Sequence, residues 1–388
     1  MRNIVFHIAL FFSVVWLFSC SDSSEDKAVE KTPENNDVVQ QNIDIPVGFV
    51  HVTQVIAGDF NRNGFQDVAV ISKQAHMVIF NNITGSTEFA DFKEYDISKP
   101  NVSMCSSDIN NDGNIDIIPM MEAGVGQFLL GDGSGGFASA NETLTFIGRA
   151  RHMICVDINK DNLQDIIATG YGTVNIYINQ GHMAFERIYF KINNMFINKL
   201  VSVADIDADG NMDILLPDFG QRVLYVIWNK GNNSFEKPVP IFYAEDSSMG
   251  AAVPINLLDG KNNPVIVYTI DGADELVFIE KTGADLQFKE LKRIKVLSSP
   301  FLLNIADMNN DKIDDIVVSH HPDTTAGDKA NIAVCYAPDF QCPDVFSVVG
   351  HPLYSVTTDW DGDGFLDIFV PLEYDAKKVV YMHSPGQS

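Results

Sequence analysis

The feature that most constrains this fold is a nine-residue acidic segment that recurs along the 388-residue chain. Copies begin at residues 59, 108, 157, 205, 307 and 359, and a run of apolar, mostly β-branched residues follows each copy. The copies lie about 50 residues apart, except for one interval of about twice that length. The missing copy is expected at 256–264, where the apolar run persists but the set of acidic ligands is lost. The sequence therefore predicts seven similar units, six of them with an intact acidic segment.

Each intact segment places side-chain oxygens at positions 1, 3, 5 and 9 and a main-chain carbonyl at position 7. This spacing wraps a hard cation, and all-oxygen ligation with several carboxylates favours Ca²⁺ over Mg²⁺ or Zn²⁺. Position 6 is Gly in four copies, which suits the left-handed backbone of a sharp turn; Asn162 tolerates that backbone, and Lys312 does so less well. An Asx-rich turn without metal would explain one copy but not six.

The sequence thus predicts about six Ca²⁺ ions with a structural role, because the ligand sets look closed and recur unchanged. The segment at 59–67 has two carboxylates and is predicted to be the weakest site, and the fifth unit is predicted to bind no Ca²⁺. The predicted ligands are Asp59, Asn61, Asn63, Phe65, Asp67, Asp108, Asn110, Asp112, Asn114, Asp116, Asp157, Asn159, Asp161, Leu163, Asp165, Asp205, Asp207, Asp209, Asn211, Asp213, Asp307, Asn309, Asp311, Ile313, Asp315, Asp359, Asp361, Asp363, Phe365 and Asp367.

The segments are not EF-hands, because no Glu stands at position 12 and the flanks are β-branched runs rather than amphipathic helices. Each unit is predicted to hold four strands, with the loop between the first two and a phenylalanine leading the last. Four strands in about 50 residues are typical of a propeller blade. The predicted fold is all-β, a seven-bladed β-propeller with Ca-binding loops in six blades, in which the stretch 42–47 completes the last blade and leaves no open edge. The leading phenylalanines are Phe89, Phe137, Phe185, Phe235 and Phe288.

The repeated loops and their β frame resemble the FG-GAP/VCBS repeats of the integrin-α N-terminal propeller. The resemblance covers roughly residues 45–385, and its departures are the degraded fifth loop and the non-glycine residues Asn162 and Lys312. It implies seven blades and a binding or adhesion module, since propellers of this family are often not enzymes.

The N-terminus reads as a targeting segment. An apolar run at 4–18 follows Arg2, is too short for a comfortable membrane span, and matches a signal-peptide core. It ends in Leu-Phe-Ser-Cys20, which resembles the lipobox of bacterial lipoproteins and implies lipidation of Cys20; the alternative is a plain signal peptide with an incidental cysteine. We therefore expect a lipoprotein signal peptide at 1–19, a disordered tether at 20–41 and the propeller at 42–388. The expected location is a bacterial cell envelope, with a lipid anchor at Cys20. Ser21, a weaker signal, favours the outer membrane.

Net charge and cysteine content restrict the possible binding partners and disulfides. A net charge of -26 excludes nucleic-acid binding by a basic patch, and 46% hydrophobic residues exclude a disordered acidic protein. Cys335 and Cys342 flank a short turn and could either close it as a disulfide or stay free. Cys105 and Cys155 lie on apolar strands and are predicted to be buried free thiols. The protein is expected to be monomeric.

Function is predicted on the face opposite the loops, where first strands start and second strands end. Cations, histidines and tyrosines at these places suit an anionic glycan or a carboxylate-bearing partner. Three classes stay open: an envelope-anchored binding or adhesion module, a polysaccharide (uronate) lyase, and a structural component of an envelope assembly. The ligand-face residues are Arg149, Arg151, Lys199, Arg222, His320 and His321, and the candidate catalytic acids and bases are His51, His152, His351, Tyr171 and Tyr354.

Overall fold

The computed structural model describes residues 42–49, 51–85, 89, 92–97, 101–196, 200–244, 249–257, 265–270, 272–282, 287–322, 329–373 and 378–383. The predicted signal peptide, Cys20, the predicted tether and Lys199 lie outside these residues, as does most of the degraded fifth loop. The described part of the chain contains no helix that is long and apolar enough to span a membrane.

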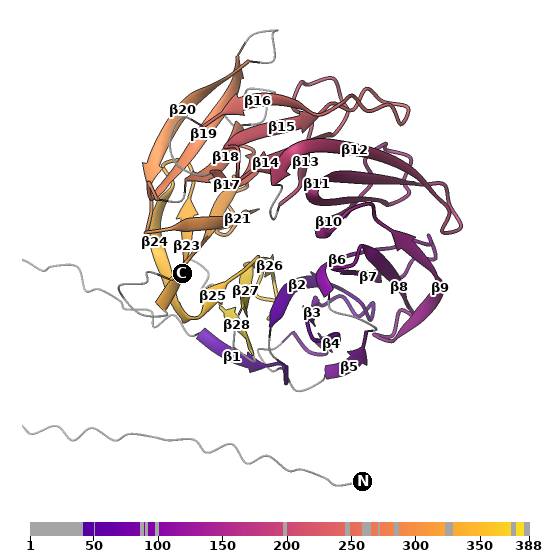
Figure 1. The fold of residues 1–388 in the computed structure, drawn as a ribbon. Helices are drawn as coiled ribbons and strands as arrows, with labels where there is room; N and C mark the ends of the chain where they lie inside the picture. The colour runs from indigo at the N-terminus through magenta and orange to yellow at the C-terminus, as the bar shows by residue number, and fades with distance from the viewer. Residues whose placement is uncertain are drawn as a thin grey trace, which may run out of the picture. The chain divides into compact units, whose positions relative to one another are not determined.

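The strands form seven antiparallel sheets that surround one axis, each with its first strand innermost and later strands farther out (Figure 1). This arrangement confirms the predicted all-β, seven-bladed propeller. Blades 1 to 3 comprise β2 (Val52–Gly58), β3 (Asp67–Ser72), β4 (His76–Phe80) and β5 (Phe92–Asp96); β6 (Asn101–Ser107), β7 (Asp116–Met121), β8 (Val125–Gly131) and β9 (Phe137–Thr145); and β10 (Ala150–Val156), β11 (Asp165–Asn179) and β12 (Phe185–Phe196).

Blades 4 to 6 repeat the same order of strands. They comprise β13 (Ser202–Ala204), β14 (Asp213–Asp218), β15 (Val223–Ile227) and β16 (Val239–Tyr243); β17 (Met249–Ile255), β18 (Val265–Ile270), β19 (Glu275–Thr282) and β20 (Gln287–Lys295); and β21 (Pro300–Ala306), β22 (Asp315–His320), β23 (Lys329–Tyr336) and β24 (Gln341–Val349).

Blade 7 is assembled from both ends of the propeller. Its inner part is β25 (His351–Pro352) and β26 (Val356–Thr358), followed by β27 (Asp367–Glu373) and β28 (Lys378–Met382). The outermost strand is β1 (Asn42–Pro46), which pairs antiparallel with β28 from Asn42 opposite Met382 to Pro46 opposite Lys378. An ion pair of 2.6 Å between Lys378 Nζ and Asp44 Oδ2 spans the same two strands. The stretch before the first loop therefore supplies the strand that the last repeat lacks.

Two details depart from the predicted blade. Blade 3 has three strands, because β11 runs over 15 residues through the stretch that forms two strands elsewhere. Phe235 does not lead the last strand of blade 4, since β16 begins at Val239. Phe89 does not lead the last strand of blade 1 either, since β5 begins at Phe92. Its ring instead stacks on Trp360 at 4.9 Å between the centroids, within an aromatic cluster at the junction of blades 7 and 1.

The second strand of a blade is the most buried. Every residue of β3, β7, β14, β18 and β22 is buried. Neighbouring blades cover both faces of these strands, which explains their continuous apolar runs. Outer strands such as β20 alternate exposed and half-buried residues because one of their faces meets water. Several hydrophobic clusters lie between adjacent blades rather than in one central core.

Side-chain hydrogen bonds join the inner strands of neighbouring blades. Gln54 Oε1 in blade 1 accepts from Ser103 Oγ in blade 2 at 3.0 Å, and Ser103 Oγ accepts from Met153 N in blade 3 at 3.1 Å. His152 Nδ1 then accepts from Val201 N, beside blade 4, at 3.2 Å. Similar bonds join blade 4 to 5, 5 to 6 and 6 to 7. The ring is therefore closed by specific polar contacts as well as by apolar packing.

The structure contains two disulfides. Cys335 and Cys342 are bonded across the hairpin of β23 and β24. Cys105 and Cys155 are also bonded, with their Cα atoms 5.6 Å apart, so the prediction of free thiols was wrong. The two residues are separated by 50 positions, which is one repeat, and therefore occupy equivalent places on β6 and β10. Sequence inspection of each strand alone could not show that adjacent inner strands bring the two sulfurs together.

Candidate functional site

The acidic loops form one candidate site; we number them by blade, as loop 1 (59–67), loop 2 (108–116), loop 3 (157–165), loop 4 (205–213), loop 6 (307–315) and loop 7 (359–367). The aspartate at position 1 accepts two backbone N–H groups of its own turn. In loop 1, Asp59 accepts from Asn63 at 3.0 Å and from Gly64 at 2.9 Å. The other loops repeat this two-oxygen pattern.

Left-handed backbone at two positions makes these turns possible. Position 6 has a positive φ in all six loops, including Asn162 at 68° and Lys312 at 72°. Position 4 is left-handed as well, as in Arg62 at 58° and Ala208 at 62°. The left-handed backbone at position 4 was not predicted, because glycine, which would signal it, stands there only in loop 7.

The aspartate at position 9 is the most buried carboxyl of each loop. In loop 1, Asp67 is fully buried, and its oxygens accept from Phe60 N at 2.9 Å and Asn82 N at 2.7 Å. Burial raises the pKa of Asp67 to about 6, against the opposing effect of these hydrogen bonds. The same cause raises the pKa of the equivalent aspartates in loops 2, 3 and 4 to about 6. These carboxyls are thus placed where a bound cation would offset their desolvation.

The donor set fits a calcium ion. Carboxylate oxygens of Asp205, Asp207 and Asp213 in loop 4 lie within 4.8 Å of one another, as do those at positions 1, 3 and 5 of loop 7. Ca²⁺ binds oxygen at about 2.3–2.6 Å, so two ligands on opposite sides of one ion lie about 5 Å apart. These two loops are the ones with aspartate at position 3. Basic side chains lie beside both loops: Lys230 Nζ lies 3.3 Å from Asp207, and His383 Nδ1 lies 3.2 Å from Asp367.

Loops 2, 3 and 6 have asparagine at position 3. In each of them, Nδ2 of that asparagine donates to the position-5 carboxylate at 2.9–3.0 Å. The amide thus supplies a neutral donor where loops 4 and 7 place a second charge. At positions 1, 3, 5 and 9, loops 2, 3 and 6 therefore carry one carboxylate fewer than loops 4 and 7, as their sequences indicate.

Adjacent loops are linked to each other, which the sequence did not reveal. The position-4 side chains of loops 1, 3 and 6 reach the next loop, with Arg62 donating to Asn114 at 3.2 Å and Asn310 donating to the carbonyl of Gly364 at 2.5 Å. A buried asparagine at the end of the third strand makes a second link: Asn82 donates to the carbonyl of Trp360, and its equivalents in blades 3 and 4 do the same to the preceding blade. The loops therefore form one connected face.

The opposite face carries the residues that were predicted to bind a ligand, at the first-strand starts and second-strand ends. Arg149 is exposed and pairs with Glu122 at 3.9 Å. His321 stacks on Phe301, with 3.9 Å between the ring centroids, and lies 6.0 Å from the ring of His351. His51 and Arg222 have left-handed backbone, with φ of 57° each. The predicted residues are therefore spread over several blades instead of forming one cluster.

Two predicted surface histidines are buried. His320 is 1% exposed, so its assignment to the ligand face was wrong. It ends β22, a strand covered on both faces, and its Nδ1 lies 3.0 Å from the carbonyl of Ser298. His152 is buried as well, and its Nδ1 accepts a backbone N–H, which requires the neutral ring. Burial lowers the pKa of each histidine to about 4.

A polar pocket lies at the axis on this face. Its lining includes Thr53, Lys73, Val102, Arg151, Tyr354 and Glu373, from blades 7, 1, 2 and 3, around about 460 Å³ of space. The guanidinium of Arg151 lies 4.6 Å from the centre of the Tyr171 ring and donates to the Tyr171 hydroxyl. Lys73 pairs with Glu373 at 2.9 Å. The pocket thus combines Arg151 and Tyr354, which were predicted, with Lys73 and Glu373, which were missed.

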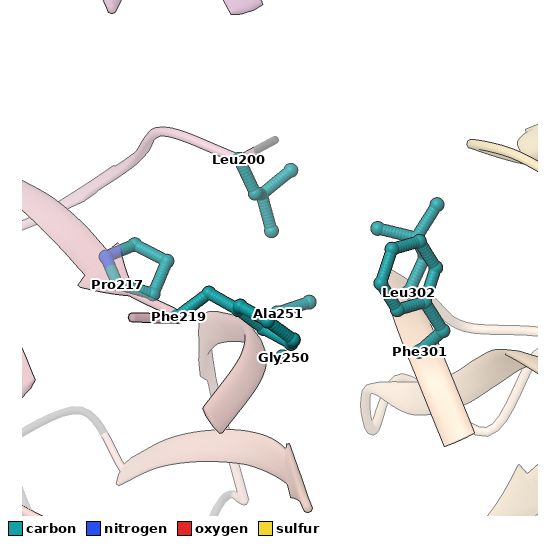
Figure 2. A pocket seen from close by; sticks show the side chains of 7 residues that line it. All are labelled: Leu200, Pro217, Phe219, Gly250, Ala251, Phe301 and Leu302. Atoms are coloured by element: carbon teal, nitrogen blue, oxygen red, sulfur yellow. The ribbon is translucent and has the colours of Figure 1, made fainter. Parts of the chain in front are cut away.

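An apolar pocket lies at the ends of strands on the same face, in blades 4, 5 and 6. Figure 2 shows a gap with Leu200, Pro217, Phe219 and Ala251 on one side and Phe301 and Leu302 on the other. The pocket is open to solvent and, with that open space, measures about 310 Å³. It was missed because its residues read as ordinary strand ends. Tyr354 of the polar pocket packs against the same hydrophobic cluster as Leu200 and Phe301. The polar and apolar pockets therefore border the same hydrophobic cluster.

Comparisons with known proteins agree with this geometry. A family model for the FG-GAP-like repeat matches residues 157–216, which include loops 3 and 4. No curated protein matches the chain.

Among solved structures, BBS1N in complex with ARL6DN, soaked with mercury, is similar at 10% identity and a TM-score of 0.62, covering 88% of this chain and 95% of that one. The lead-soaked form of that complex gives 11% identity and a TM-score of 0.60, with coverage of 89% and 98%. The Cps50 (Swd1) β-propeller domain of "Myceliophteria thermophila" gives 10% identity and a TM-score of 0.55, with coverage of 88% and 98%. Likeness at such low identity supports the fold alone. The chain is a seven-bladed β-propeller that carries FG-GAP-like repeats.

Proposed function

We propose that this protein is a binding module of the bacterial cell envelope, with structural Ca²⁺ in six loops and a ligand site on the opposite face. The observation that carries the proposal is the contrast between the two faces. The loops repeat one arrangement of carboxylates and backbone donors six times, whereas the polar and apolar pockets are each lined by a single set of residues. A site for a specific ligand is generally a single concavity with few polar groups.

The chemistry of the axial pockets supports binding over catalysis. His152, the most central candidate base, accepts a backbone N–H at Nδ1 and is buried, so that nitrogen is not available to a substrate proton. The ring of Tyr354 lies 5.2 Å from that of His152, and burial raises the pKa of Tyr354 well above its usual value, which disfavours its use as a base near neutral pH.

The test is a glycan array together with a pull-down from envelope extracts, both run with Ca²⁺ and with chelator. The proposal predicts saturable, Ca²⁺-dependent capture of one ligand class, and loss of capture in the variant Arg151→Gln. A uronate-lyase assay run in parallel would favour the enzyme if unsaturated products appeared. Absence of any glycan or protein ligand from both screens would contradict the proposal.

The envelope location has its own test. Cys20→Ser should release the protein from the membrane fraction, because a lipid chain is the only proposed anchor. The wild-type protein, fractionated in parallel, is the control, and release of neither form would count against lipidation at Cys20.

A further inference from the structure

We propose that the polar and apolar pockets on the face opposite the loops, which we together call the axial mouth, bind a small amphipathic monocarboxylate. Its carboxylate lies at Arg151 and Tyr354, and its apolar part lies in the pocket formed by Leu200, Phe301 and their neighbours. The inference rests on the proposed function, because it takes the face opposite the loops to be the binding face. It adds the chemical class of the ligand and the place of each of its parts.

Arg151 and Tyr354 offer donors without acceptors. The Nε of Arg151 and the hydroxyl of Tyr354 are both enclosed, and neither has a hydrogen-bond partner among the described residues. A buried donor without an acceptor destabilises the folded state, and such groups are rare in folded proteins. Both side chains line the same pocket. Both atoms are shielded from water, so an entering carboxylate would reach them by displacing the side chains that enclose them.

The charge of the pocket favours an anion. Three charged side chains line it, and Lys73 and Glu373 pair with each other at 2.9 Å. No carboxylate pairs with Arg151 in the described part of the chain, where its contacts are with Tyr171. The guanidinium therefore supplies the excess positive charge in a protein whose net charge is -26. A planar carboxylate suits the donor fork of arginine better than a neutral group does.

The neighbouring wall of the mouth is apolar. The residues that line the second pocket carry no charged or hydrogen-bonding side chain (Figure 2). A hydrogen bond joins the residues next to the two pockets: His152, which follows Arg151 in β10, accepts from Val201, which follows Leu200. Tyr354 packs against the same cluster as Leu200 and Phe301. One ligand with a charged head and an apolar arm can therefore use both pockets.

The experiment is isothermal titration of the Ca²⁺-loaded protein with hexanoate, acetate and hexanol. We expect hexanoate to bind more than tenfold tighter than acetate, because of its buried methylenes, and more than tenfold tighter than hexanol, because of its charge. Tyr354→Phe should weaken hexanoate binding about tenfold and leave hexanol unchanged. Leu200→Ala should lower the affinity for hexanoate toward the affinity for acetate, and it should leave the affinity for acetate unchanged.

The controls separate binding from folding. Lys289→Gln alters an exposed cation that pairs with Glu280 at 3.2 Å and lines neither pocket, and it should bind all three probes as the wild type does. Tyr354→Phe keeps the ring and removes a hydroxyl without partner, so its melting temperature should not fall. Equal affinity for hexanoate and acetate, or hexanoate binding unchanged in Tyr354→Phe, would overturn the inference. An envelope ligand captured in the pull-down would then leave the proposed function standing.

Discussion

The loop face and the axial mouth are built by the same blades, yet they differ in almost every respect. Each loop is organised by its own nine residues, with position 1 and position 9 carboxylates bonded to the backbone of that turn. The mouth also takes residues from equivalent places in several blades, but their side chains differ: Thr53, Val102 and Arg151 each stand six residues before an acidic loop. Repeated side chains therefore mark the loop face, which we expect to stabilise the ring, and unlike side chains at equivalent places mark the face that can be specific.

The largest expected effect is the removal of Ca²⁺, which acts on the loop face alone. If each of six sites binds with a Kd of ~10⁻⁴ M, 1 mM Ca²⁺ contributes roughly 1.4 kcal/mol per site and about 8 kcal/mol in all. This is comparable to the whole stability of a domain. Thermal melts in 1 mM Ca²⁺ and in excess chelator, with Mg²⁺ as the control, measure it. An unchanged melting temperature would show that the loops need no metal.

The next largest effect is expected from removing the disulfide between Cys105 and Cys155, which links blades 2 and 3 independently of the loops. Cys105→Ser combined with Cys155→Ser opens a closed segment of 50 residues and should lower the free energy of unfolding by roughly 4 kcal/mol. The pair Cys335→Ser and Cys342→Ser is the matched control, because it opens a segment of 7 residues and should lower that energy by roughly 2 kcal/mol. Denaturant unfolding at fixed Ca²⁺ compares them. Equal losses would mean that loop length does not govern the effect.

Histidines buried near the mouth predict a loss of stability in acid. The pKa of His320 is lowered to about 4 by burial, whereas in the unfolded chain it is about 6.5. The stability contribution is therefore complete above pH ~6.5 and is lost as the pH falls toward 4, by about 3 kcal/mol. His320→Asn, which keeps a donor toward Ser298, should reduce the slope of the free energy of unfolding over this range.

The loop carboxylates also titrate in this range, so wild type and His320→Asn must be compared at the same saturating Ca²⁺. Their difference then reports on His320 alone. Parallel curves for the two proteins would mean that His320 does not gain a proton on unfolding.

The smallest predicted effect distinguishes the loops from one another. Asp207→Ala removes a charge and a ligand from loop 4, whereas Asn61→Ala removes only a neutral ligand from loop 1. The affinity lost at loop 4 should exceed that lost at loop 1 by about tenfold, or about 1.4 kcal/mol. Stoichiometric Ca²⁺ titrations of the two variants against wild type give the answer. A larger loss in Asn61→Ala would contradict the assignment of charge as the deciding factor.

The fold and the loops could be predicted from the sequence because their determinants are local. A loop is recognised from the spacing of aspartates over nine residues, and Lys312 adopts the left-handed backbone that this spacing requires. The period of the repeat then sets the number of blades. The strand at 42–46 could also be placed, since the last repeat lacks an outer strand and β1 is found on β28.

Only the tertiary structure decided which side chains share the mouth. Arg151, Tyr354 and Lys73 come from blades 3, 7 and 1, and closure of the ring brings them to one pocket. The same reason explains the bond between Cys105 and Cys155 and the burial of His320: strand order identifies the end at which a residue lies, but the packing of adjacent blades determines whether its side chain meets solvent, a partner or the core. The sequence by itself therefore determined the repeated architecture, and contacts between blades determined the site that is not repeated.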